Sequence, residues 1–457
     1  MNSNIMTFRK IFRRADSAYK ALLLLFIIYP GILNSQVPVK MPQDSEAVKQ
    51  WIEESFAKDK IPPFSFIYGG RNSDTFIRSW QFSSEKSETQ DRRLTEYIFM
   101  YSESRSGLRV KCSLTCYNDY PAVEWVLKFS NTSTRNSKVI EKAAVIDHAF
   151  SSGEQGKFIL HHSRGSNALR SDFQPVDELM LPGENIYMTP SGGRSSDNTA
   201  FPFFNLEMPG GQGFVTSIGW SGKWYADVSQ NSGNSVSLKA GMEKMSLMLL
   251  PGEEIRTPRI CLLFWKGNDR MIGHNQFRRF ILAHHSRMIN GKFAEYPLSG
   301  SFDYGDPAPC GEYECLTGEY AIALVNRYRY FKVLPELFWL DAGWYEGCGA
   351  NKQNGSWWQN VGNWSADKER FPNGLKAVSD AVHSTGAKFM VWFEPERVRP
   401  GNEIAEDHPE WLLKLQGNDN YLFDLGNPEA RVWLTDRISV SYLRPAFLPA
   451  CPRDCNI

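Results

Sequence analysis

The chain has 457 residues, which predicts two or three domains, and its 42% hydrophobic content with 13% aromatic residues is enough for large buried cores. Its formal net charge is zero, which argues against a nucleic-acid partner or an anionic membrane surface, because both favour a basic excess. The 14 Trp and 18 Tyr residues suit sugar rings and hydrophobic cores equally well, so the composition leaves their role open.

Residues 1–35 have the pattern of a secretory signal peptide. Basic residues, among them Arg13 and Arg14, precede the apolar run 21–28, and a short polar stretch follows as far as Ser35. The apolar run is much shorter than the roughly 20 residues that span a bilayer. We therefore expect export to the periplasm or the extracellular space, with no membrane association after signal cleavage. A retained membrane anchor is the alternative.

Eight cysteines are compatible with disulfides in an exported chain, but they do not define a pairing. Cys112 and Cys116 lie four residues apart in a strand-like pattern, so roughly 13 Å would separate them, which is too far to share one metal ion. Cys310 and Cys315 could meet across a loop, but no histidine or second cysteine pair stands nearby at zinc spacing. The sequence predicts no metal site.

Residues 37–268 predict a large antiparallel β-sandwich. Short alternating runs, such as 122–129 and 235–240, are separated by clusters of Gly, Asn and Ser, which is typical of strands joined by turns. Residues 44–56 are the early exception, and we expect them to form a helix.

The pattern changes near residue 269, and residues 269–295 are predicted to contain a linker helix, because apolar residues between 269 and 287 recur at helical spacing. Strands and helices then alternate over 296–440, as at the start of a parallel (β/α)8 barrel. Residues 441–457 fit neither period and form an aberrant tail. The fold class is therefore a β-sandwich followed by an incomplete α/β barrel.

Three barrel strands and three helices can be placed by residue. The strands are expected at 301–303, 337–340 and 388–393, and the helices at 318–330, 372–383 and 431–438.

Polar residues follow two of these strands directly. Asp341 comes after the apolar strand 337–340, and Glu394, Glu396 and Arg397 come after 388–393. An isolated Asp in such a loop more often stabilises a turn. Here several polar groups converge on one rim beside tryptophans, which indicates a sugar subsite at the carboxyl end of the sheet.

Glu394 and Glu396 would lie roughly 7 Å apart on one strand, near the carboxylate separation of an inverting glycosidase. Neighbours on one strand approach a ligand from the same side, however, so they cannot flank a glycosidic bond. We interpret Glu394 as a structural carboxylate, whereas Glu396 or Arg397 could reach a ligand. The histidines, including the pairs 161–162 and 284–285, form no catalytic triad with a serine, and no phosphate-binding loop is present.

Several motifs together resemble the melibiase-type α-galactosidases of glycoside hydrolase family 36. They are Leu340-Asp341-Ala342-Gly343-Trp344, Gly362-Asn363-Trp364, Arg370-Phe371-Pro372-Asn373-Gly374-Leu375, Trp392-Phe393-Glu394-Pro395-Glu396 and His408-Pro409-Glu410-Trp411. Upstream, Gly193-Arg194-Ser195-Ser196, Pro202-Phe203-Phe204 and Gly219-Trp220-Ser221-Gly222-Lys223-Trp224 resemble signatures of the family's N-terminal domain. The resemblance runs from about residue 60 to about residue 440.

The resemblance implies an N-terminal β-supersandwich, a (β/α)8 catalytic barrel and a retaining mechanism without metal or organic cofactor. It implies that Asp341 binds galactose hydroxyls and that Trp364 lines the sugar pocket. Trp344 and Glu396 complete the candidate substrate-binding set, with Arg397 as a weaker contact. It also implies an oligosaccharide substrate, and members of the family are often oligomers.

The chain departs from the family pattern at two places. Ala342 stands where the family has a second Asp, which leaves related sugars such as N-acetylgalactosaminides or L-arabinopyranosides open as substrates. The motif of the nucleophilic Asp is expected after Ile438, and 441–457 contains no such motif. We therefore expect this chain to be a truncated or frameshifted copy that carries no catalytic carboxylate and is inactive alone. A non-catalytic carbohydrate-binding sandwich is the alternative.

Overall fold

In the computed structural model, the described residues run from 38 to 439, except for 91, 232–233, 303–312, 350–354, 363 and 415. They divide into two compact units, one that ends at Arg287 and one that begins at Met288. The predicted signal segment 1–35 and the tail 441–457 lie outside the described residues. The first unit is almost entirely β-structure, and the second combines short strands with helices.

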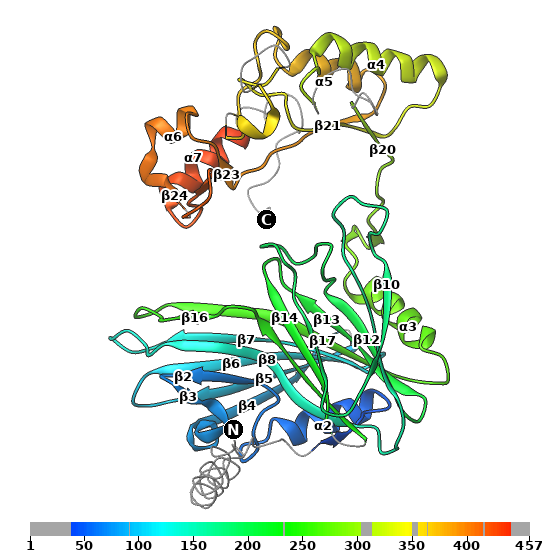
Figure 1. Cartoon of the computed structure of the whole chain (residues 1–457), viewed down its shortest axis with the longest axis vertical. Helices are drawn as coiled ribbons and strands as arrows, with labels where there is room; N and C mark the ends of the chain where they lie inside the picture. The colour runs from blue at the N-terminus through cyan, green and yellow to red at the C-terminus, as the bar shows by residue number, and fades with distance from the viewer. Residues whose placement is uncertain are drawn as a thin grey trace, which may run out of the picture. The chain divides into compact units, whose positions relative to one another are not determined.

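Two large sheets form the first unit (Figure 1). Within the described residues, one sheet has eight strands: β1 (Val39–Lys40), β2 (Ser65–Tyr68), β3 (Arg71–Asn72), β8 (Ile140–Ser151), β11 (Asn185–Met188), β14 (Trp224–Gln230), β15 (Ser235–Met242) and β16 (Ser246–Leu247). The other sheet, also counted over the described part, has nine: β4 (Gln81–Glu88), β5 (Leu94–Ser102), β6 (Leu108–Tyr117), β7 (Ala122–Asn131), β9 (Phe158–Ser163), β10 (Pro175–Met180), β12 (Phe203–Met208), β13 (Gln212–Gly219) and β17 (Glu254–Lys266). The sandwich predicted from the sequence is confirmed.

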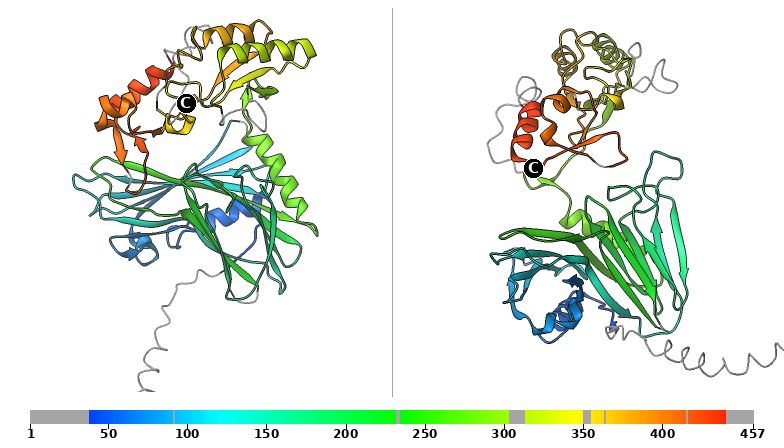
Figure 2. Two further views of the ribbon diagram at one scale, coloured as in Figure 1. Left: turned by 45° about the horizontal axis from the view of Figure 1, so that its top comes forward. Right: turned by 60° about the vertical axis from the view of Figure 1, so that its left-hand side comes forward.

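The core of the sandwich lies between these sheets (Figure 2). Along β6, the buried Val110, Cys112 and Leu114 alternate with more exposed residues, as expected for a strand with one face in a core. Trp125 on β7 is buried, and its indole Nε1 donates a hydrogen bond to the carbonyl of Val145 on β8, 2.7 Å away. This bond joins the two sheets and leaves no polar atom of the indole without a partner.

The predicted early helix is α2 (Ser45–Ser55), which contacts β6 and β7. Asp44 caps it, since the Asp44 carboxylate accepts a hydrogen bond from the Ala47 amide at 2.8 Å. Val48, Trp51 and Ile52 face the sandwich core. The prediction of a helix over 44–56 is confirmed.

The linker helix predicted within 269–295 ends earlier than that range. Helix α3 (Met271–His284) packs on β17 and β13 through Phe280 and belongs to the first unit. Strands β18 (Met288–Ile289) and β19 (Lys292–Phe293) follow as a hairpin, whose turn residues Asn290 and Gly291 both have positive φ. An Asn-Gly pair favours this hairpin turn. The helix therefore ends before residue 288 and does not continue through the predicted range.

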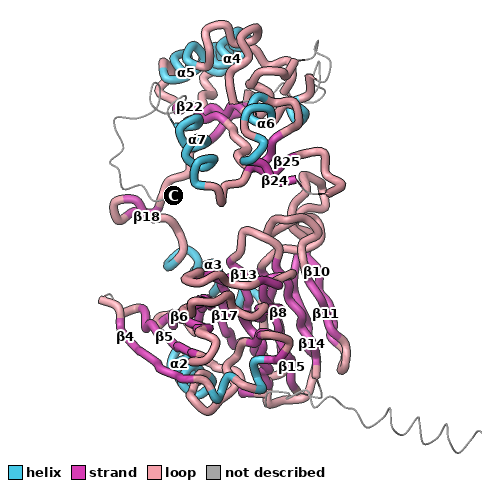
Figure 3. Tube along the Cα trace, turned by 90° about the vertical axis from the view of Figure 1, so that its left-hand side faces the viewer, coloured by secondary structure: helices cyan, strands magenta, loops and turns pink. Residues whose placement is uncertain are grey.

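The second unit contains a parallel three-stranded sheet, β20 (Ser299–Ser301), β21 (Leu337–Leu340) and β22 (Lys388–Val391). Helices α4 (Gly318–Phe331) and α5 (Lys376–His383) lie side by side next to it (Figure 3). Helix α5 begins four residues later than predicted, because 372–375 form a turn in which Gly374 has a left-handed φ of 62°. The two strands predicted at 337–340 and 388–393 are found, the second ending at Val391, whereas the first strand lies at 299–301 and shares only Ser301 with the predicted 301–303. The incomplete barrel stays a prediction.

A small antiparallel sheet, which the sequence did not predict, completes the second unit. It is formed by β23 (Arg397–Val398), β25 (Tyr421–Phe423) and β24 (Leu412–Lys414), with the short helices α6 (Glu403–Asp407), η3 (Trp357–Gln359) and η4 (Pro409–Trp411) in the same unit. Helix α7 (Pro428–Ile438) starts three residues before the predicted 431–438, capped by Asn427. In the part of the chain that the structure describes, every helix is too short or too polar to span a bilayer.

Candidate functional site

The parallel pairing of β21 with β22 brings the two polar strand ends together. Leu337 to Leu340 pair in register with Lys388 to Val391, and the Trp392 amide donates to the Leu340 carbonyl at 2.9 Å. Phe338, Leu340 and Phe389 are buried and anchor the strands. Since carboxyl ends of parallel strands meet at one edge of a sheet, Asp341 and Trp392 lie at the same edge.

Asp341 is half-buried at the end of β21. One of its carboxylate oxygens accepts a hydrogen bond from the Ala342 amide at 2.7 Å, which fixes the start of the loop. Gly343 continues the loop at a positive φ of 83°, and a Cβ there would lie 2.9 Å from the Tyr313 side chain and carbonyl. Only glycine fits this close approach, and the resulting turn leads the chain away from the strand end.

Trp344 and Trp364, both predicted substrate contacts, are buried: their exposed fractions are 0% and 3%. Their rings lie 6.3 Å apart, and the Trp344 indole donates to the Trp392 carbonyl at 3.0 Å. Both rings therefore pack in the interior of the unit, and Trp344 is hydrogen-bonded to the residue that follows β22. Their role as direct sugar contacts stays a prediction.

Two other tryptophans, which the sequence analysis did not select, are more accessible. Trp357 and Trp392 are only partly buried, and their rings meet edge to face at 5.7 Å. The Tyr345 hydroxyl donates to the Trp357 carbonyl at 2.9 Å, and burial raises the pKa of Tyr345, so this group stays a neutral donor. The position of Trp392 directly after β22 was the available sequence signal.

Arg397 lies against Trp357 and Glu394. Its guanidinium donates to a Glu394 carboxylate oxygen at 2.5 Å, and its Cζ lies 5.7 Å from the centre of the Trp357 ring. The Arg397 Nε atom is buried without a hydrogen-bond partner. Glu396 is exposed beside this pair. The assignment of Glu394 as a structural carboxylate is consistent with its pairing to Arg397.

A buried pair, Asp367 and Arg370, connects several loops of the second unit. Asp367 accepts hydrogen bonds from the amides of Glu369 and Arg370, at 3.1 and 3.0 Å. The Arg370 guanidinium donates to the carbonyls of Leu316 and Tyr345, and burial lowers its pKa without removing its charge. The arginine thus ties three segments of the unit together.

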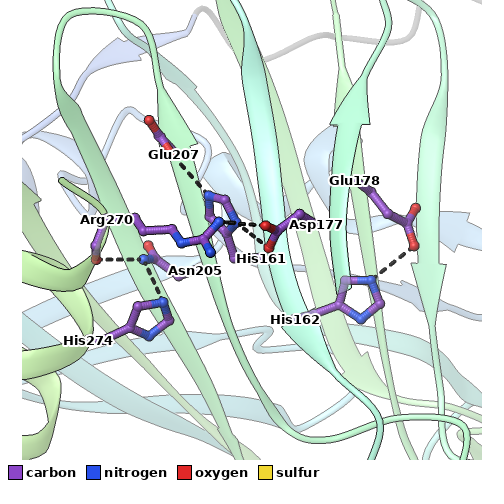
Figure 4. A network of polar contacts seen from close by, with 8 residues as sticks. All are labelled: His161, His162, Asp177, Glu178, Asn205, Glu207, Arg270 and His274. Atoms are coloured by element: carbon purple, nitrogen blue, oxygen red, sulfur yellow. Dashed lines mark hydrogen bonds and ion pairs between the residues drawn. The ribbon is translucent and has the colours of Figure 1, made fainter. Parts of the chain in front are cut away.

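The sandwich contains a polar network that a sequence search for catalytic groups could mistake for an active site (Figure 4). His161 on β9 lies between Asp177 on β10 and Glu207 on β12, at 2.8 and 2.9 Å, and Arg270 donates to Asp177 at 2.6 Å. Hydrogen bonds from His161 and Arg270 lower the pKa of Asp177. The network joins three strands to the residue before α3, so we interpret it as structural.

Metal binding has no support within the described residues, where no three His, Cys, Asp or Glu side chains are placed to hold an ion. Cys112, Cys116 and Cys261 are buried free thiols in the sandwich, and burial raises the pKa of each. These thiols are therefore neutral and unreactive at ordinary pH.

Parts of the chain are similar to known α-galactosidases. Residues 324–440 match the Melibiase family model. The α-galactosidase Mel36A of Lactobacillus acidophilus is 26% identical over 48% of this chain, and an α-galactosidase of Escherichia coli is 25% identical over 60%. These alignments cover 29% and 39% of the two relatives, so the chain spans well under half of their length.

Solved structures show a shared fold. A family 36 α-galactosidase, AgaA of Geobacillus stearothermophilus, solved in complex with stachyose, aligns with a TM-score of 0.65 and 16% identity. The alignment covers 83% of this chain and 53% of that structure. At this level of identity the likeness concerns the fold.

Proposed function

We propose that this chain belongs to the melibiase-type α-galactosidases of glycoside hydrolase family 36 and carries the sugar-binding part of their active site; the match of residues 324–440 to the Melibiase model supports this. The observation that carries the proposal is the parallel pairing of β21 and β22, which puts Asp341 and Trp392 at one edge of a sheet. Arg397, in β23, is connected to this edge through Trp357, whose ring lies against that of Trp392. The proposed ligand is the terminal α-galactosyl residue of an oligosaccharide.

The chemistry of this edge suits a sugar. The carboxylates of Asp341 and Glu396 accept hydrogen bonds from sugar hydroxyls, and the partly exposed rings of Trp357 and Trp392 offer apolar faces to the C–H side of the pyranose. Arg397 is held in place by Glu394 and can donate to a ring or hydroxyl oxygen.

The proposed reaction is retaining hydrolysis, in which two carboxyl groups about 5 to 5.5 Å apart act as nucleophile and acid/base. The family resemblance assigns both groups to strands after residue 440, and β20, β21 and β22 would be the first strands of the barrel. We therefore propose that residues 1–457, taken by themselves, bind galactosides without hydrolysing them.

The test uses the purified 457-residue protein. Calorimetry with melibiose is expected to show binding, and an assay with p-nitrophenyl α-galactoside is expected to show no release of nitrophenol. Asp341→Ala should abolish melibiose binding, while Asp380→Ala, on the exposed side of α5, should not change it. Hydrolysis by the pure protein would contradict the proposed inactivity, and absence of melibiose binding would contradict the proposed site.

The sugar specificity depends on Ala342, which is 1% exposed beside Asp341. A binding panel of galactose, N-acetylgalactosamine and L-arabinose glycosides separates the three candidate ligands. Preference for either of the last two would replace the α-galactoside assignment with that sugar.

Export is proposed from the signal pattern of residues 1–35. Cys315 is disulfide-bonded, which supports an oxidising compartment. Cys310, which could meet Cys315 across a loop, lies outside the described residues. Recovery of the protein outside the cytoplasm with a new N-terminus near residue 36 would support export, and an intact Met1 on cytoplasmic protein would exclude it.

A further inference from the structure

A cleft of about 970 Å³ opens at one end of the sandwich, in a part of the first unit that the proposed function does not use. Three separate stretches of chain line it: the β2–β3 hairpin with the turns that follow it, the β5–β6 connection and the β7–β8 loop. The lining residues are Tyr68, Arg71, Thr75, Phe76, Ser79, Trp80, Gln81, Ser102 to Ser106, Ser133 to Asn136 and Lys138. The volume is at the upper end of the range for small-molecule sites.

Positive charge predominates among the side chains that line the cleft. Arg71, Arg105, Arg135 and Lys138 are exposed, and no ion pair is formed by any of them among the described residues. Glu103 is the one carboxylate among the described lining residues. Several cations around one concave surface raise the local concentration of anions, because the low-dielectric walls focus the field.

Glu103 offsets only one of these four positive charges, and its oxygens already have hydrogen-bond partners. They accept hydrogen bonds from the amides of Arg105, at 3.1 Å, and Ser106, at 2.6 Å. Partial burial raises the pKa of Glu103, but the hydrogen bonds from Ser106 and Arg105 outweigh it and the net pKa is lowered. The Glu103 carboxylate therefore stabilises the turn at residues 103–106.

The backbone around the cleft is held in place by hydrogen bonds between the loops. The Asn131 side chain donates to the Arg135 carbonyl at 2.7 Å and accepts from the Ser133 amide at 3.0 Å. The Thr132 amide donates to the Gly107 carbonyl at 2.9 Å, which ties the β7–β8 loop to the β5–β6 connection. A site formed in advance loses less conformational entropy when a ligand binds.

The wall of the cleft adds aromatic surface and neutral polar groups. Trp80 and Phe76 stack at 5.2 Å, and the Arg71 guanidinium lies 5.7 Å from the centre of the Phe76 ring. Seven serine and threonine hydroxyls and the amides of Gln81 and Asn136 also line it. Such a mixture suits a ligand with several hydroxyls as well as negative charge, and a single phosphate would fill only a small part of the volume.

We propose that this cleft binds an anionic oligosaccharide, with Arg71, Arg105, Arg135 and Lys138 contacting its carboxylate or sulfate groups. Arginine forks pair with both groups through two parallel hydrogen bonds. The site is separate from the strand ends of the second unit and does not depend on the function proposed for them.

The test measures binding to the full 457-residue chain by calorimetry. The probe is a heparin-derived tetrasaccharide, which carries both sulfate and carboxylate groups and no galactose. Maltotetraose is the neutral match in size, and sodium phosphate is the small anion. We expect the tetrasaccharide to bind, more weakly as salt is raised, and the other two to bind at least ten-fold more weakly.

Matched variants locate the site. Arg105→Ala with Arg135→Ala should weaken tetrasaccharide binding at least ten-fold with an unchanged melting temperature, because both side chains are exposed. Lys157→Ala with Arg170→Ala removes the same charge from exposed positions outside the cleft and should leave binding unchanged. Absent binding, equal binding of maltotetraose or phosphate, or an equal loss in both double variants would overturn the proposal.

Discussion

Buried charge is arranged differently in the two units. In the sandwich, Glu124 is 5% exposed and is met by Arg259 at 2.6 Å and His285 at 3.4 Å. Burial raises the pKa of Glu124, but the hydrogen bond from His285 and the charge of Arg259 outweigh it, so the net pKa is lowered. In the second unit, Glu394 and Arg397 keep 24% and 29% of their side-chain surface exposed at a strand end.

The difference teaches where to look for function in such a fold. Asp197, directly after the Gly193-Arg194-Ser195-Ser196 motif of the sandwich, accepts hydrogen bonds from Ser191, Gly192 and Thr199, so it has little capacity left for a ligand. Glu396 has the same chemical group, but it is exposed at the edge of the parallel sheet. The hydrogen bonds already made by a carboxylate, more than its presence in a motif, separate a structural role from a binding role.

The largest expected effect tests the sandwich core. Trp125→Ala removes a buried indole and its bond to Val145, so we expect the free energy of unfolding to fall by about 3–5 kcal/mol. The control is Trp358→Ala in the second unit, where the ring is 45% exposed and a loss below about 1 kcal/mol is expected. Urea unfolding followed by circular dichroism measures both. Similar losses would contradict the assignment of the core.

The next effect is acid sensitivity of the sandwich through His148. Burial lowers its pKa to about 4, and Trp51 donates to its Nε2, so the folded state holds a neutral ring. The unfolded chain takes up a proton near pH 6.5, so this stability is fully present above that pH and is lost as the pH falls toward 4. The total loss is about 3 kcal/mol.

The control for this prediction is His148→Gln, which keeps an acceptor for the Trp51 indole but does not titrate in this range. Unfolding free energies measured across the interval should fall with acidification in the parent and less steeply in the variant. Equal slopes would exclude His148 as the source.

The sequence correctly predicted the helices and strands whose local residue pattern matches the way they are buried in the structure. The helix at 44–56, the strand-like pattern around Cys112 and Cys116 and the apolar strand 337–340 are such cases, and each matches the structure. It failed at 288–293, which the predicted linker helix range 269–295 included and which forms an Asn-Gly hairpin, and at 372–375, where Pro-Asn-Gly forms a turn before the helix and not its first residues. In both places the local turn residues decide the structure.

The sequence predicted which strand ends form the candidate site, but not which of its side chains are buried. The strand ends place Asp341 and Trp392 together at the sheet edge. The burial of Trp344 depends on Tyr345, Trp364 and Phe393, which pack around it from three different segments. The cleft of the sandwich is lined by three loops far apart in the sequence, so no single sequence motif predicts it.

A smaller effect tests the second unit. Arg397→Ala should weaken melibiose binding about ten-fold, equivalent to about 1.4 kcal/mol, because its charged donors are lost. The unfolding free energy should change by less than about 1 kcal/mol, since the pair with Glu394 is partly exposed. Arg399→Ala, whose guanidinium lies over Trp358, is the matched control and should keep the parent affinity. A large loss of stability in the Arg397 variant would make it structural, like the charges of the sandwich.

The smallest effect concerns Glu396, whose carboxylate is exposed beside Arg397. Glu396→Gln keeps an acceptor oxygen but removes the charge, so a hydrogen bond from a sugar hydroxyl weakens without disappearing. We expect melibiose binding to weaken about three-fold with no change in unfolding free energy. Glu346→Gln, another partly exposed carboxylate of the same unit, should change neither quantity. If both variants bind melibiose like the parent, Glu396 does not contact the sugar, and the exposed carboxylate at this edge is no better a ligand than one elsewhere on the surface.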